Sequence, residues 1–188
     1  MSTPLRFQGQ RGLTLIELMV TVIILAVGLL GMAGLQSRLQ QSEMEAYQRS
    51  QALLLLSDMA NRLATNRAKA ITYETSLVGI GVGSTCETGT ATQQQVDAGE
   101  WCNALQGAAE MDEDGNELGA MIGGRGCVEV LGAGSYRVSV AWQGLAPLSV
   151  PTNSACGSGQ YNGPSGSTCT ADLCRRVVST IVRVADLK

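Results

Sequence analysis

Residues 18–35 form an uncharged stretch, LMVTVIILAVGLLGMAGL, in which Thr21 carries the only classically polar side chain. As an α-helix, this stretch rises about 27 Å, which is close to the bilayer core thickness of about 30 Å. A core helix of this length in a soluble protein would show a polar face, and this stretch shows none. We therefore expect residues 18–35 to span a membrane.

The residues before this stretch indicate its orientation. They include Arg6 and Arg11 but no acidic residue, and basic flanks remain on the cytoplasmic side of a membrane. Residues 36–188 are therefore expected outside the cytoplasm. A cleaved secretory signal is an alternative, because residues 31–33 (GMA) form a passable small-x-small cleavage site. A lipoprotein is excluded, since no cysteine lies near Ala33.

Glu17 is the single acidic interruption of the apolar N-terminal run. A carboxylate at the bilayer centre costs on the order of 2.5–3.5 kcal/mol, and less near the interface, so an ordinary signal or anchor has no use for it. The string GLTLIE at residues 12–17 resembles the prepilin signal of type IV pilins and type II secretion pseudopilins. The resemblance implies that a membrane prepilin peptidase cuts after Gly12 and methylates the new N-terminal amine of Leu13. The apolar helix would then stay in the mature protein.

The same resemblance implies that Glu17 acts in assembly. A buried carboxylate in a fibre of packed helices needs a cation, because an unpaired buried charge is very costly, and the implied cation is the Leu13 amine of a neighbouring subunit. A pair between Glu17 and Leu13 of one chain is compatible with this in the membrane-resident state. Glycines recur at Gly28, Gly31 and Gly34. They are expected either to permit close helix packing or to weaken a helix that extends in a fibre.

The helix is expected to continue from residue 13 to about residue 69. No proline or glycine occurs between Gly34 and Gly79, and residues 36–70 are rich in good helix formers. Asp58 and Arg62 form an i,i+4 pair. A 3-4-3 spacing predicts the apolar face at Leu53, Leu56, Ala60 and Leu63, with Leu55 and Met59 beside it.

Within roughly residues 9–69 the resemblance narrows to the minor pilins, on the strings at residues 28–36, 49–52 and 58–66. It implies incorporation at low copy into a type IV pilus, where the chain helps prime assembly or cap the tip. The implied partners are the prepilin peptidase, other minor pilins, the major pilin, the inner-membrane assembly platform and, around residues 18–35, membrane lipid. Many major pilins have a proline where Gly34 lies, so their helix melting does not carry over.

The organisation expected from these features is a leader at residues 1–12, a long helix at 13–69 and a head at 70–188. Three runs in the head have β-type patterns, at residues 127–131, 135–142 and 176–184, and a Gly-Ala-Gly turn joins the first two. An antiparallel sheet laid on Leu53, Leu56 and Leu63 completes an α+β fold, which matches the type IV pilin fold.

The second run, residues 135–142, alternates strictly, which predicts one buried and one solvated face. The buried face is expected to carry Tyr136, Val138, Val140 and Trp142, and the solvated one Arg137, Ser139 and Ala141. Residues 74–126 are expected to be a loop-rich insert, and residues 144–170 a long Gly/Ser/Pro/Asn-rich loop.

All six cysteines lie in the head: Cys86, Cys102, Cys127, Cys156, Cys169 and Cys174. A head outside the cytoplasm is expected to form disulfides from them, and six cysteines allow 15 pairings. We expect a Cys86–Cys102 bridge, and Cys127 paired with either Cys156 or Cys174. A cysteine-only zinc site is disfavoured because no CxxC pair occurs, and no metal or other cofactor is expected.

The chain contains no histidine, which excludes Ser-His-Asp and Cys-His catalysis. No other paired catalytic constellation stands out, so we expect no enzyme. Residues 112–117 (DEDGNE) superficially resemble a calcium loop, but the glycine and glutamate an EF-hand needs are misplaced, so an acidic turn is the preferred interpretation.

Charge is unevenly distributed along the chain. Residues 70–124 hold nine acidic and no basic residues, residues 125–188 have a net charge of +3, and the chain cut after Gly12 has a net charge of −5. The acidic insert and the basic end are expected to form a surface for neighbouring subunits. The DNA-binding candidates in the basic end are Arg175, Arg176 and Arg183, which are expected to be solvated strand residues. Nucleic acid is therefore an unlikely partner.

Two other functions remain open from the sequence. A minor pseudopilin of a type II secretion system would carry the same processing signal, and only its partners distinguish it. A pilus-tip adhesin or DNA receptor is compatible with the long loops and the six cysteines. For the lead interpretation, the chain is expected to be held in the inner membrane with a periplasmic head and then carried to a cell-surface pilus.

Overall fold

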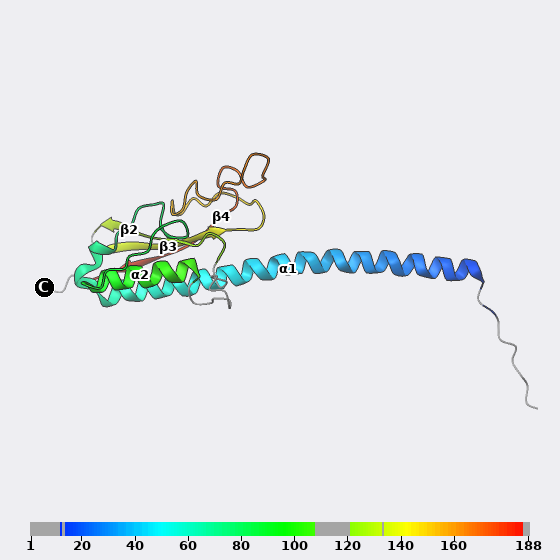
Figure 1. Cartoon of the computed structure of the whole chain (residues 1–188), viewed down its shortest axis with the longest axis horizontal. Coiled ribbons are helices and arrows are strands. Elements are labelled where there is room, and N and C mark those ends of the chain that lie inside the picture. Colours follow the sequence, from blue (N-terminus) through cyan, green and yellow to red (C-terminus); the bar gives the residue numbers. More distant parts are fainter. Residues whose placement is uncertain (1–11, 13, 108–120, 133, 186–188) are drawn as a thin grey trace, which may run out of the picture. The chain divides into compact units, whose positions relative to one another are not determined.

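The structure is a computed structural model that describes residues 12, 14–107, 121–132 and 134–185. It has an α+β fold in which a long helix precedes an antiparallel sheet, as predicted (Figure 1). The elements are α1 (Leu15–Thr65), the 3₁₀ helix η1 (Arg67–Tyr73), β1 (Ile80–Gly81), α2 (Gln93–Gln106), β2 (Arg125–Gly132), β3 (Ser135–Gln143) and β4 (Arg175–Arg183).

The chain divides into two compact units, Met1–Ser42 and Glu43–Lys188. In the first unit, every described residue is exposed, and the apolar side chains from Leu15 to Leu35 cover all sides of α1. Of the helices in the described part of the chain, only α1 has the length and apolar composition needed to cross a membrane. The second unit contains the sheet, α2 and the core.

Helix α1 ends at Thr65, about four residues earlier than predicted. Asn66 leaves helical geometry with φ −96° and ψ 39°, and the backbone continues as η1. The Thr65 hydroxyl donates to the Asn61 carbonyl, and the Asn66 amide donates to the Tyr73 hydroxyl over 2.9 Å. The Asn66–Tyr73 bond ties the end of α1 to the end of η1, where the chain has left the predicted helix.

The core face of α1 is offset from the predicted one. Leu56 and Leu63 are buried as expected, but the third member of their stripe is Ala52, whereas Leu53 is 47% exposed. The expectation that Leu53 supports the sheet is therefore wrong. Ala52, Leu56 and Leu63 follow the i, i+4, i+11 spacing of one helix face, which Leu53 does not share, and Met59 completes that face.

The sheet is a four-stranded antiparallel meander in the order β1-β2-β3-β4. The β2–β3 hairpin turns where predicted, between Gly132 and Gly134, whose φ angles of +94° and +70° favour glycine. Strand β4 pairs with β3 along its whole length, from Ser135↔Arg183 to Gln143↔Arg175. This register decides which side chains of β3 and β4 share a face.

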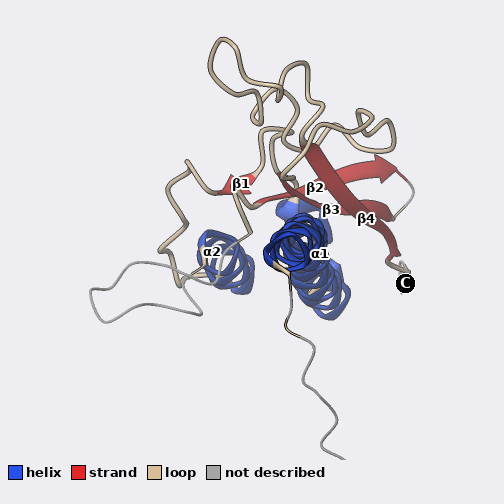
Figure 2. Ribbon diagram, turned by 90° about the vertical axis from the view of Figure 1, so that its right-hand side faces the viewer, coloured by secondary structure: helices blue, strands red, loops and turns tan. Residues whose placement is uncertain are grey.

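One face of β3 packs on α1, and the other lies under loops (Figure 2). The α1 side carries Tyr136, Val138, Val140 and Trp142, as the alternation predicts. The opposite face is not solvated, which corrects the prediction: Ser139 and Ala141 are fully buried. The segment between β3 and β4 folds over them, and Ala141 packs there with Cys156 and Tyr161.

Helix α2 lies in a segment that was expected to be loop. Its N-terminus is closed by a capping box of Thr92 and Gln95, and its C-terminus by Gly107 in the left-handed conformation. Trp101 fixes α2 in place: it is fully buried, and its Nε1 donates to the Leu55 carbonyl of α1 over 2.9 Å.

Two substitutions of the same kind test the face of α1 that supports the sheet. Leu56→Ala removes a buried side chain and is expected to lower the free energy of unfolding by about 2–5 kcal/mol. Leu53→Ala, three residues earlier, is expected to change it by about 0.5 kcal/mol, since that side chain is largely exposed. Urea unfolding of the full chain in detergent, followed by near-UV circular dichroism, measures both. Equal losses would contradict the observed face.

Candidate functional site

The candidate processing segment lies at the start of α1. Gly12 is exposed, and a Cβ added to it would meet no atom within 4 Å. Leu13 lies outside the described residues. Thr14 precedes the helix, and its carbonyl accepts from the backbone amides of Glu17 and Leu18 at 3.1 and 3.2 Å. The chain before the helix therefore presents an accessible glycine, which suits a protease substrate.

Thr14 and Glu17 have the sequence spacing of a capping box. The Thr14 hydroxyl lies 3.4 Å from the Glu17 amide nitrogen, at the long end of a hydrogen bond. Glu17 also places a negative charge in the first turn of α1, where it interacts favourably with the helix dipole. This local role of Glu17 was not predicted, although the T-x-x-E pattern is visible in the printed sequence.

The Glu17 carboxylate is exposed in the isolated chain. Among the residues that the structure describes, no basic side chain lies within 4.0 Å of it. A cation for this carboxylate would have to come from the amine that processing creates or from another molecule. A Cβ added to Gly28, Gly31 or Gly34 of α1 would meet no atom from outside the helix backbone within 4 Å, so these glycines leave small, open positions on the helix.

In the head, the six cysteines form three disulfides and no thiol is free. The expected Cys86–Cys102 bridge is present, and Cys127 pairs with Cys156, one of its two expected partners. The third bridge, Cys169–Cys174, closes a short loop before β4. The bridges fasten segments without regular structure to α2, to β2 and to the turn that precedes β4.

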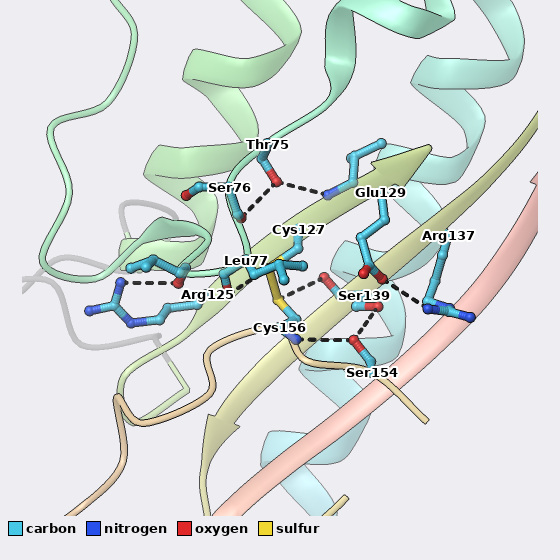
Figure 3. The surroundings of a disulfide bond; sticks show 12 residues. Thr75, Ser76, Leu77, Arg125, Cys127, Glu129, Arg137, Ser139, Ser154 and Cys156 are labelled. Carbon is cyan, nitrogen blue, oxygen red and sulfur yellow. Dashed lines mark hydrogen bonds and ion pairs between the residues drawn. A yellow bond between two sulfur atoms is a disulfide. The ribbon is translucent and has the colours of Figure 1, made fainter. Parts of the chain in front are cut away.

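The Cys127–Cys156 bridge holds the loop layer on the sheet (Figure 3). Beside it, the Ser154 hydroxyl donates to the Ser139 hydroxyl over 3.0 Å and accepts from the Cys156 amide over 3.2 Å. Both serines are buried, so these bonds supply partners that water would otherwise provide. The loop therefore covers β3 with its polar groups paired.

The arginines at the start of β4 are not solvated, contrary to expectation. Arg175 is 3% exposed and donates to the carbonyls of Ser154, Cys156 and Pro151 at 2.9–3.1 Å. Its Nε also lies 3.3 Å from the Asp172 carboxylate, an ion pair without hydrogen-bond geometry.

Arg176 is the next residue and points to the opposite face of the sheet, because side chains alternate along a strand. It pairs with Glu45 of α1 over 3.2 Å. Arg183, at the end of β4, is exposed as expected. Two of the three proposed DNA-binding arginines are therefore bound within the head and present no patch to nucleic acid.

A second charge cluster joins α1 to α2. The predicted Asp58–Arg62 pair is present at 2.9 Å, and Arg62 also contacts Asp97 at 3.1 Å and Glu100 at 2.6 Å. Partial burial alone would lower the pKa of Arg62, but its bonds to the three carboxylates outweigh this and raise that pKa. The roles of Asp97 and Glu100 were not predicted, because both residues lie on α2, which was not expected from the sequence.

Buried Asp97 also accepts a short hydrogen bond from the Tyr73 hydroxyl. Burial, and secondly this bond, raise the pKa of Tyr73 to about 12. Tyr161, under the loop layer, donates to the Gly123 carbonyl over 2.9 Å, and burial raises its pKa as well. The acidic turn at residues 112–117 lies outside the described residues. Among those described, no group of three His, Cys, Asp or Glu side chains is placed to hold a metal ion.

Comparison with known families gives one match, to the model of the prokaryotic N-terminal methylation motif, over residues 8–33. The matched range contains Gly12, Glu17 and most of the apolar part of α1. No curated protein and no solved structure matches the chain. The chain therefore carries the N-terminal signal of type IV pilin-like proteins, and the head is described by its own geometry.

The Tyr73–Asp97 contact predicts a loss of stability at alkaline pH. The folded pKa of Tyr73 is about 12 and the unfolded value is about 10, so this contribution is complete below about pH 10 and is lost as pH rises through about 12. Tyr73→Phe lacks the contribution throughout. The melting temperatures of wild type and variant are expected to differ at about pH 9 and to converge by about pH 12. A difference that stays constant with pH would contradict the assignment.

Proposed function

We propose that the chain is a minor pilin: a structural subunit that prepilin peptidase cuts after Gly12 and that enters a type IV pilus at low copy. The observation that carries the proposal is the match to the N-terminal methylation motif at residues 8–33, with an accessible Gly12 and with Glu17 at the start of an apolar helix. That motif supports a type IV pilin or pseudopilin-like protein and favours a structural role over an enzymatic one.

The finer assignment rests on the resemblance of residues 9–69 to minor pilins, in particular to the pilus modification protein PilV. In this proposal the subunit helps prime assembly at the pilus tip with other minor pilins, the major pilin and the inner-membrane assembly platform. An exposed apolar helix and a head whose cysteines are all paired support a membrane-held subunit with a periplasmic head.

A pseudopilin of type II secretion would use the same signal, and co-purification with membrane partners distinguishes the two. Recovery with pilus assembly proteins supports the proposal, and recovery with secretion proteins replaces it. A DNA-receptor function loses two of its three candidate arginines, because Arg175 and Arg176 are bound inside the head.

Substitutions at the processing segment separate cleavage from assembly. Gly12→Glu is expected to leave the precursor uncut, so mass spectrometry should find the full chain and no N-methylated Leu13. Glu17→Val is expected to be cut normally but to fail to support pili, measured as surface pilus protein. Normal piliation by both variants would contradict the proposal.

Glu17→Gln distinguishes charge pairing from helix capping. Glutamine also fits the third position of a capping box but has no charge. If pairing with a neighbouring amine is the role of Glu17, Glu17→Gln should fail in assembly as Glu17→Val does. Thr14→Ala is the matched control: it removes the capping hydroxyl, worth about 0.5–2 kcal/mol, and should retain assembly. Full assembly by Glu17→Gln would assign Glu17 to capping alone.

A further inference from the structure

A cavity of about 230 Å³ lies where α1 passes the end of β3 and the start of β4. Its walls include Glu45, Arg49, Trp142, Leu148, Arg176 and Val178. Trp142 and Arg176 are directly opposite each other in the β3–β4 pairing, and directly opposed residues of an antiparallel pair share one face of the sheet. Both side chains therefore lie on the face toward α1, which supplies the other two charged residues.

The Glu45 carboxylate is fully engaged within the head. Its Oε1 accepts from the Leu145 amide at 2.9 Å and from Arg176 Nη2 at 3.2 Å, and its Oε2 accepts from Arg176 Nε at 3.3 Å. Arg176 also donates to the carbonyls of Ala146 and Leu173. Gly144 leaves room for this arrangement, because a Cβ there would lie 2.5 Å from Arg176 Cζ. Glu45 and Arg176 therefore neutralise each other.

Arg49 remains without a carboxylate partner among the described residues, because Glu45 pairs with Arg176. It follows Glu45 by four residues, the spacing at which a helical glutamate and arginine normally pair, but Glu45 is held by Arg176 instead. Within the described part of the chain, no carboxylate lies within 4.0 Å of the Arg49 guanidinium. Its side chain is exposed at the cavity.

Trp142 lines the same cavity and carries a buried donor without a partner. The residue is 4% exposed, and its Nε1 has no hydrogen-bond acceptor among the described residues. The other tryptophan, Trp101, is equally buried but donates to the Leu55 carbonyl. A buried donor without an acceptor costs free energy, so Trp142 favours a ligand that brings an acceptor oxygen.

We propose that this cavity binds a single carboxylate group on a short aliphatic stem. The carboxylate accepts from Trp142 Nε1 and pairs with Arg49, and its methylene groups pack on Leu148 and Val178. Two arginines and one glutamate give the site one net positive charge, which matches a monoanion better than a phosphate dianion. The carboxylate belongs either to a small free acid or to an aspartate or glutamate side chain of a neighbouring protein, and the proposal does not depend on pilus assembly.

Indole N–H resonances test this directly. The ¹⁵N-labelled full chain in detergent micelles has two such signals, one from each tryptophan, and Trp142→Phe assigns them. Titration with sodium acetate, at ionic strength held constant with sodium chloride, is expected to move the Trp142 signal saturably, with half-saturation at roughly millimolar acetate. The Trp101 signal should stay in place, because its donor is already bonded.

Arg49→Gln should weaken acetate binding at least about tenfold without unfolding the head, since Arg49 is exposed and has no described ion pair. Arg67→Gln, another exposed arginine outside the cavity, is the matched control and should bind as wild type does. The proposal is overturned if no saturation occurs, if both indole signals move together, or if Arg49→Gln binds as tightly as wild type.

Two further probes define the ligand. Inorganic phosphate should bind more weakly than acetate, and tighter phosphate binding would overturn the carboxylate assignment. N-acetylglutamate α-amide carries a glutamate side chain between two amide groups. Tighter binding of this compound than of acetate supports the side chain of a neighbouring protein as the source, whereas equal or weaker binding supports a small free acid.

Discussion

The head depends on the packing of one tryptophan. Trp101 is fully buried, and its ring lies over Gly126 of β2, where an added Cβ would come within 2.2 Å of the ring. Its Nε1 donates to the Leu55 carbonyl of α1. One side chain therefore joins α1, α2 and the sheet. Since the segment after Gly12 contains no phenylalanine, few other side chains are large enough to do this.

Two of the three disulfides stabilise the opposite side of the sheet, where few apolar side chains are buried. The layer over Ser139 and Ala141 is built from loops, and its apolar cluster is small. Cys127–Cys156 fixes that layer at its centre, and Cys169–Cys174 fixes its end. Each bridge contributes about 2–4 kcal/mol, a large fraction of the stability of a domain of this size. The head is thus stabilised by helix packing on one face and by covalent bonds on the other.

Much of the fold was predictable from local periodicity. The apolar run of α1, the alternation from Tyr136 to Trp142 and the Gly132–Gly134 turn are short-range patterns, and the structure contains all three. Helix α2 was missed because glutamine, aspartate and glycine dilute its apolar pattern, although its Thr92–Gln95 capping box is visible in the sequence. The shift of the core face from Leu53 to Ala52 shows that small residues define a face as firmly as large ones when they lie on the right helical spacing.

The charges were less predictable because their partners are distant in sequence. Arg176 and Glu45 are 131 residues apart, and the acceptors for Arg175 are backbone carbonyls in a loop without regular structure. Only the β3–β4 register and the path of α1 bring these groups together. Charged groups that have no partner among the described residues are candidates for contacts with other molecules. Glu17 has no described cation and Arg49 has no described anion, and each lies on the exposed surface of α1. Because their charges are not used inside the described head, Glu17 and Arg49 are available for contacts with other molecules.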